Sequence, residues 1–138
     1  ANRALLRQVY NSIEEEEQKF AVNCTNTLDW KFIASVKECI EKNMSDPDFN
    51  VEMLSSRHHM SRTSFFNKLK VLTGYAPADY IRMIRLQHAA QLLKQGEYTI
   101  TEIADIVGFS DTKYFREVFK KYYNVSPSKF NKSQNIDG

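Results

Sequence analysis

The chain is poor in the residues that interrupt regular backbone. Of its 138 residues, only 4 are glycine and 3 are proline. A β-sandwich needs many tight turns, and those turns draw heavily on both residue types. The composition therefore favours an all-α protein.

Cysteine and long apolar runs are also scarce. Cys24 and Cys39 are the two cysteines, too few for the disulfide framework of a small secreted domain. We therefore expect reduced thiols in a cytoplasmic protein. No run of about 18 apolar residues occurs, so no membrane span is predicted. Because the chain starts at Ala1 without a leader segment, we expect it to be a fragment of a longer protein.

Motifs of catalysis and metal binding are missing as well. The sequence contains no G-x-S-x-G, P-loop or H-E-x-x-H pattern. His58 and His59 are adjacent, so on a helix they point about 100° apart and cannot form a two-ligand face. We predict no enzyme activity, no metal site and no cofactor for this segment.

Positive charge is concentrated in one part of the chain. The formal net charge is only +2, but residues 1–49 carry 6 basic against 9 acidic side chains, whereas residues 50–138 carry 13 against 8. The C-terminal two-thirds is therefore the part suited to an anionic partner such as nucleic acid.

The N-terminal region has a helical pattern followed by a polar segment. Leu6, Ile13 and Phe20 recur at seven-residue spacing, which is typical of a short coiled-coil seam or of the tail of a preceding domain. We predict an N-terminal helical linker over residues 1–28. Asp29 is then the expected N-cap of the first helix of a domain that extends over residues 29–132, with a polar tail at 133–138.

From residue 50 onward, helix boundary signals follow one another closely. After a short helix that starts near Val51, Ser61 is an N-cap candidate for a helix that stops at Thr73–Gly74. Pro77 suits the first turn of a long helix over 77–95. Thr99 and Glu102 form a capping box for the next helix. A last long helix is expected over 111–123. The apolar stripe of the 77–95 helix is Ile81, Ile84, Leu86, Ala89, Ala90 and Leu93.

This series contains an internal repeat. The segment NVEMLSSRHHMS (50–61) aligns with TITEIADIVGFS (99–110) at a shift of 49, which pairs Ser61 with Ser110. After one inserted residue the shift is 50, and Pro77 pairs with Pro127. Two copies are too few for a solenoid. They suit two helix-turn-helix subdomains, at about 50–74 and 99–123, joined by the 77–95 helix.

The turn between the two short helices needs a residue that tolerates a positive φ angle. Gly108 provides it in the second copy. His59 occupies the equivalent position of the first copy, where histidine is uncommon but tolerated better than a branched residue. The second helix of each pair would then enter the major groove of DNA.

Helical geometry separates a core face from a polar face in the helix after residue 61. At about 100° per residue, Phe65, Leu69 and Leu72 fall on one side. Side chains able to hydrogen-bond or contact base edges fall opposite or on the flanks. The candidate base contacts here are Arg62, Thr63, Phe66, Asn67 and Lys70.

The helix after residue 111 has the same division. Phe115, Phe119 and Tyr122 are predicted to face inward. The candidate base contacts on the outer side are Thr112, Lys113, Arg116, Glu117 and Lys120.

Phosphate contacts should supply most of the affinity and its salt dependence. The candidates are basic side chains and the backbone amides at the two helix starts. They are Arg57, Ser61, Lys68, Arg82, Arg85, Asp111, Lys121 and Lys129.

The length of the connecting helix agrees with this interpretation. Its 19 residues span about 28 Å at 1.5 Å per residue. Two recognition helices on one face of DNA lie about 34 Å apart, one helical turn. A helix of this length, with the width of each subdomain, can bridge successive major-groove segments. The competing interpretation is a helical protein-interaction module without DNA specificity, in which the polar faces are only solvated.

The second copy resembles the AraC/XylS family of bacterial transcription regulators. The stretch TITEIADIVGFSDTKYFREVFKKYYNVSPSKF fits the family pattern I-x-x-I-A-x-x-x-G-F-x-x-x-x-Y-F-x-x-x-F-K-x-x-x-x-x-x-P-x-x-[YF]. YIRMIRLQHAAQLL is similar to the family's connecting helix. The first copy departs from the pattern at Ser55, where the family often has Ala, and at His59, where it often has Gly.

This resemblance implies two helix-turn-helix units on one monomer that bind double-stranded DNA and contact RNA polymerase. DPDFNVEML and LTGYAPADYIRMIRL look closest to the DNA-binding ends of hybrid two-component regulators, in which a sensor, a histidine kinase and a receiver precede this domain. A homodimer of the full-length protein would suit direct-repeat half-sites.

Overall fold

Six helices are found in the described part of the chain, residues 27–130 of the computed structural model. No strand occurs within this range, which confirms the all-α prediction. The helices are α2 (Thr27–Lys42), α3 (Val51–Arg57), α4 (Arg62–Thr73), α5 (Pro77–Gln95), α6 (Ile100–Ile106) and α7 (Thr112–Tyr123).

Side-chain caps explain where most of these helices begin. The Ser61 hydroxyl accepts a hydrogen bond from the Ser64 amide, as predicted for the start of α4. The predicted capping box of α6 is present, with Thr99 and Glu102 each accepting from the other's backbone. The prediction for Asp29 was wrong: α2 already includes Thr27, so Asp29 lies inside its first turn.

The two copies share their backbone hydrogen bonds as well as their sequence pattern. In the first turn the Met60 amide donates to the Ser55 carbonyl at 3.1 Å, and in the second the Phe109 amide donates to the Ala104 carbonyl at 2.8 Å. His59 has φ 54° and Gly108 has φ 92°, so both predicted positive-φ positions are confirmed.

The inserted residue of the repeat lies one position earlier than predicted. Ser61 caps α4, and Asp111 caps α7 by accepting from the Lys113 and Tyr114 amides. The N-caps therefore correspond at a shift of 50, and Ser110 is the extra residue rather than the partner of Ser61. Capping defines the register here because the N-cap is the last non-helical residue in each copy.

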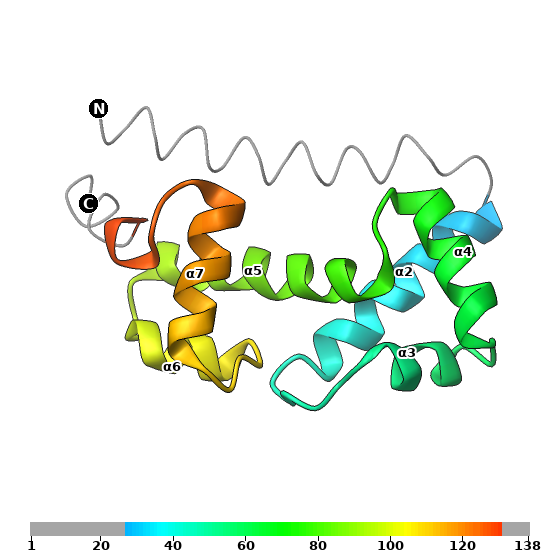
Figure 1. Cartoon of the computed structure of the whole chain (residues 1–138), viewed down its shortest axis with the longest axis horizontal. Helices are drawn as coiled ribbons and strands as arrows, with labels where there is room; N and C mark the ends of the chain where they lie inside the picture. Colours follow the sequence, from blue (N-terminus) through cyan, green and yellow to red (C-terminus); the bar gives the residue numbers. More distant parts are fainter. Residues whose placement is uncertain (1–26, 131–138) are drawn as a thin grey trace.

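Helix α5 is shared by two hydrophobic cores. One contains Leu54, Phe65 and Leu69 with the first half of α5, and the other contains Phe115 and Phe119 with the second half. The predicted apolar stripe of α5 is buried throughout. Figure 1 shows α5 as a horizontal rod, with α2–α4 at one end and α6 and α7 at the other. The two cores and the shared helix bear out the prediction of two subdomains on a linker helix.

Several predictions concern residues outside the described range. The N-terminal helix with Leu6, Ile13 and Phe20, and the polar tail, lie in residues 1–26 and 131–138. Within residues 27–130, no helix is both long and apolar enough to cross a membrane.

Candidate nucleic-acid interface

The predicted division of α4 into two faces is confirmed. Phe65 and Leu69 are fully buried and Leu72 is 7% exposed. All five candidate base-contact residues of this helix are exposed, including Asn67. The Lys70 ammonium lies 5.9 Å from the centre of the Phe66 ring, so a cation and an aromatic face are presented together on this surface.

The division of α7 differs from the prediction at one position. Phe115 and Phe119 are fully buried as expected, but Tyr123 is the buried residue of the last turn, and Tyr122 is only half-buried. The Phe119 and Tyr123 rings lie 4.8 Å apart within the second core. Tyr122 instead packs against both cores at their border. Projecting the residues of α7 around its own axis does not predict this position, because it depends on the other unit.

The outer side of α7 carries the candidate base-contact residues. Lys113, Arg116, Glu117 and Lys120 are exposed, and Thr112 is half-buried. In Figure 1, α4 and α7 stand at opposite ends of α5, and both run from the bottom to the top of the view. The structure thus presents two polar helices at opposite ends of the linker helix.

Three of the basic side chains proposed for phosphate contacts have an aromatic or acidic neighbour. The Lys68 ammonium lies 4.3 Å from the Phe32 ring centre, and the Arg57 guanidinium lies 5.7 Å from that of Phe49. Arg82 pairs with Asp79 at 3.2 Å, one helical turn away. Lys121 and Lys129 are exposed.

The two helix starts also offer backbone N–H groups, but some are already bonded within the chain. Ser61 engages the Ser64 amide, and the Asp111 carboxylate engages the Lys113 and Tyr114 amides. A phosphate at either end would therefore meet the remaining first-turn amides.

Arg85 is not a surface phosphate contact, which corrects the prediction. It is 8% exposed, and its guanidinium donates to the Gly108 carbonyl at 3.2 Å and to the Asp46 carbonyl at 2.9 Å. Burial lowers the pKa of Arg85, an effect opposed by the Asp46 charge. An arginine nevertheless stays protonated at neutral pH. Arg85 is therefore a charged, interior hydrogen-bond donor.

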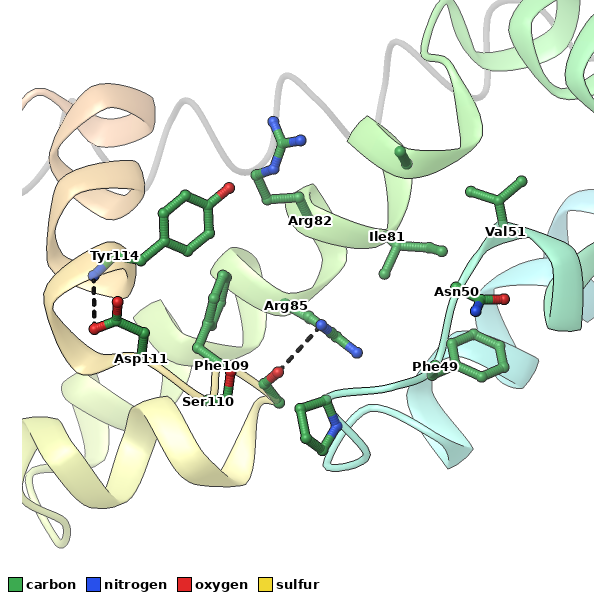
Figure 2. A pocket seen from close by; sticks show the side chains of 13 residues that line it. Phe49, Asn50, Val51, Ile81, Arg82, Arg85, Phe109, Ser110, Asp111 and Tyr114 are labelled. Atoms are coloured by element: carbon green, nitrogen blue, oxygen red, sulfur yellow. Dashed lines mark hydrogen bonds between the residues drawn. The ribbon is translucent and has the colours of Figure 1, made fainter.

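The two cores define two units: the first comprises α2–α4 with their connecting loops, and the second comprises α6, α7 and the residues that follow to residue 130. A cleft of about 320 Å³ lies between the two units, and Figure 2 shows the side chains that line it. Phe49 and Asn50 line it from the first unit, Arg82 from α5, and Asp111 and Tyr114 from the second unit. Among these residues, sequence reasoning missed Tyr114 as an interface candidate. The exposed fraction of Tyr114 is 45%. The sequence feature that could have identified it is an aromatic residue between the polar and apolar faces of α7.

The side chains at this surface are described by what they can bind. Within residues 27–130, no group of three or more His, Cys, Asp or Glu side chains could hold a metal ion. Besides the exposed apolar or aromatic side chains of Phe66, Val71 and Tyr114, the exposed groups on α4 and α7 are one amide, hydroxyls, cations and one carboxylate. These polar groups are of the types that read base edges in the major groove.

Comparison with known proteins gives matches over most of the described range. A family model described as "Helix-turn-helix domain" matches residues 54–133. Histidine kinase P4 of Formosa agariphila is 36% identical over 105 residues, which is 76% of this chain and 8% of that protein. The chain spans between 8% and 40% of the length of the curated relatives that it matches.

Two solved structures share the arrangement of helices. The C-terminal domain of the two-component response regulator yesN from Fusobacterium nucleatum is 31% identical with a TM-score of 0.68, over 73% of this chain and 98% of that one. The DNA-binding domain of AdpA, described as a global transcriptional factor and solved with a target DNA, is 28% identical with a TM-score of 0.70, over 75% of this chain and 93% of that one.

Proposed function

The chain belongs to the AraC/XylS family of helix-turn-helix proteins, and from this membership we propose that it binds DNA sequence-specifically as the output domain of a transcription regulator. The observation that carries the proposal is the pair of helix-turn-helix units with equivalent turns, whose outward polar helices stand at opposite ends of α5. Each recognition helix enters one of two successive major-groove segments.

Base recognition is assigned to the exposed sides of α4 and α7. Asn67 suits adenine, which offers both a donor and an acceptor to an amide. Lys113 suits the acceptors of guanine, and Glu117 suits the amino group of cytosine. Tyr114 joins this set because its exposed ring faces the cleft between the units.

Phosphate contacts come from both units. They hold the domain across the DNA backbone that lies between the two major-groove segments. Arg57 and Lys68 serve the first unit, and Lys121 and Lys129 serve the second. Arg82 lies between them at the central cleft. The aromatic neighbours of Lys68 and Arg57 restrict these side chains, so less conformational freedom is lost when a phosphate binds.

The domain acts within a larger signalling protein. The match to a histidine kinase, of which this chain spans 8%, and the likeness to a response-regulator domain support a hybrid two-component protein. In that setting residues 1–28 link the preceding domain to the DNA-binding domain of residues 29–132. The protein works in the cytoplasm on chromosomal DNA, contacts RNA polymerase, and dimerises in its full-length form.

The experiment that tests this function starts from DNA selected by the protein itself. Duplexes are selected from a random-sequence library with the parent chain, and affinities for the selected duplex and its single-base variants are measured by fluorescence anisotropy. Asn67→Ala and Lys113→Ala should each cost about 1–3 kcal/mol at one base step and relax the preference there.

The control is Lys42→Ala, an exposed lysine of α2 that pairs with Glu38 at 2.9 Å. It should leave the sequence preference unchanged. Selection that yields no preferred sequence would overturn the DNA-binding proposal and favour the protein-interaction module. Unchanged preference in both variants would overturn the assigned reading faces.

A further inference from the structure

Arg85 connects parts of the chain that belong to different units. Its side chain rises from the middle of α5 and donates to two backbone carbonyls, Asp46 at 2.9 Å and Gly108 at 3.2 Å. Asp46 lies between α2 and α3 in the first unit, and Gly108 lies in the turn between α6 and α7 in the second. One guanidinium therefore bridges the two units, and the dashed line that starts at Arg85 in Figure 2 marks one of these two hydrogen bonds.

The two units also touch directly at this point. A Cβ atom added to Gly108 would overlap the Met44 carbonyl oxygen and lie 3.0 Å from Arg85 Cζ. Met44, from the first unit's loop, packs against the core of the second. The absence of a side chain at Gly108 is what allows the loop, the turn and the arginine to meet.

The bridge constrains a movement that α5 alone leaves free. A shared helix sets the separation of its two ends, but each unit can tilt about the point where it packs on the helix. A planar guanidinium with two fixed donors ties both carbonyls in one geometry, and a hydrogen bond from a charged donor is stronger than a neutral one. Because Arg85 is 8% exposed, water competes little for these bonds.

We propose that Arg85 is a positioning residue that locks the two helix-turn-helix units in one relative orientation and so determines which half-site spacing the domain accepts. This proposal rests on the proposed function, since spacing matters only if both units bind one duplex. Each base pair inserted between half-sites moves them by about 3.4 Å and rotates them by about 34°. A locked pair of readers tolerates neither change, whereas a loosened pair adapts to both.

The DNA experiment compares spacing profiles. The probes are the duplex selected by the parent chain, derivatives with one base pair inserted or deleted between the two protected halves, and a duplex with one half scrambled. For the parent, insertion or deletion should lower affinity by about tenfold or more. For Arg85→Met, the loss should shrink to about threefold or less, while affinity for the half-scrambled duplex stays at the parent's value.

Two further variants separate positioning from charge. Arg85→Lys keeps the charge but not the planar pair of donors, so it should give a spacing profile between those of the parent and Arg85→Met. Arg82→Met removes the same charge from the same helix one turn earlier. It should lower affinity for every duplex alike and leave the spacing profile of the parent.

A measurement without DNA tests the lock directly. Residual dipolar couplings of backbone amides in α4 and α7 should fit one alignment tensor in the parent chain and two different tensors in Arg85→Met. Couplings in the parent that need two tensors would overturn the lock without any variant. A single tensor in a folded Arg85→Met, or an unchanged spacing profile, would overturn it as well.

The DNA measurements and the dipolar couplings together distinguish a failure of the proposed function from a failure of the Arg85 lock. A parent chain that selects no DNA contradicts the proposed function, while the dipolar couplings still decide the lock. If Arg85→Met does not fold, the spacing profile of Arg85→Lys and the residual dipolar couplings of the parent chain decide whether Arg85 locks the two units. A parent that binds its selected duplex and tolerates one-base-pair insertions contradicts the lock alone.

Discussion

Gly74 and Gly108 have similar backbone angles but very different surroundings. Their φ angles are 81° and 92°, and both lie in the left-handed region that costs an L-residue about 1–2 kcal/mol. A Cβ at Gly74 would meet nothing within 4 Å, whereas one at Gly108 would overlap the Met44 carbonyl. Comparing the two glycines therefore distinguishes the cost of the backbone conformation, which both positions share, from the cost of the close approach between the units, which only Gly108 has.

Alanine at these two positions should therefore destabilise the chain unequally. Gly74→Ala is expected to lower the free energy of unfolding by about 1–2 kcal/mol, the cost of the backbone conformation alone. Gly108→Ala should cost about 1–3 kcal/mol more because the overlap adds overpacking. Urea unfolding followed by circular dichroism measures both, and equal losses would mean that the contact with Met44 is easily relieved.

Arg82 and Arg85 show what residue-level reasoning can miss. Both are arginines on α5 three residues apart, and the sequence predicts a phosphate contact for each of them. The structure leaves Arg82 half-buried at the cleft and places Arg85 inside, bonded to two backbone carbonyls. Periodicity identifies the buried apolar stripe of α5 but not the interior position of Arg85. Protein packs against this helix from both units, so no side of its middle is simply outward.

At the scale of single helices, local capping chemistry was predictable. The capping box of α6 depends only on Thr99 and Glu102, three residues apart. Hydrogen bonds from Thr99, first from its backbone amide, hold the pKa of the Glu102 carboxyl below its usual value of 4.5. A carboxyl with a lowered folded-state pKa stabilises the fold above its unfolded pKa, and this contribution is lost as the pH falls through the folded value.

The lowered pKa of Glu102 predicts how the stability of a Glu102→Gln variant depends on pH. Glutamine can still cap the helix, so the variant removes the charge and keeps a hydrogen bond. The parent should be the more stable protein at pH 7, and the difference should shrink as the pH is lowered through 4 to 3. Urea midpoints across this range provide the measurement.

The matched control for this prediction is Glu97→Gln. Glu97 is exposed and lies outside α6, so its replacement should not reproduce the pH-dependent difference. A gap between the parent and Glu102→Gln that is constant from pH 7 to pH 3 would contradict the assigned role of the carboxylate.

Two features of single elements required the structure. That Asp29 lies inside the first turn of α2 is given by the structure, and the location of the inserted residue depends on which of two polar residues becomes the cap of α7. Ser110 and Asp111 are adjacent, and both are residue types that cap helices. In the structure Asp111 accepts the capping hydrogen bonds of α7, so Ser110 is the extra residue of the repeat.

At the scale of the whole molecule, charge is distributed over both units rather than in one patch. Arg57 lies at the end of α3, and Lys129 lies beyond α7, in the second unit. A duplex bound across both units would contact each of them. The salt dependence of affinity therefore reports how many phosphates the whole domain engages.

Arg57→Ala and Lys129→Ala should each reduce the slope of log affinity against log salt concentration by about 1. Each should also weaken binding to all duplexes alike, since a phosphate contact carries no base information. Anisotropy titrations from 50 to 200 mM salt measure the slope. The control is Lys42→Ala, which removes a lysine paired with Glu38 and should leave the salt slope unchanged. Equal slopes for all three variants would contradict the assigned phosphate contacts.

The sequence by itself determined the helical class, the repeat, the caps of α4 and α6, and the exposed sides of α4 and α7. These features follow from interactions within a few residues and from periodicity on helices with one buried side. Only the tertiary structure decided that Arg85 is interior, that Tyr123 rather than Tyr122 completes the second core, and that Gly108 touches the first unit's loop. Those outcomes depend on groups brought together from distant parts of the chain, where two units pack on one shared helix.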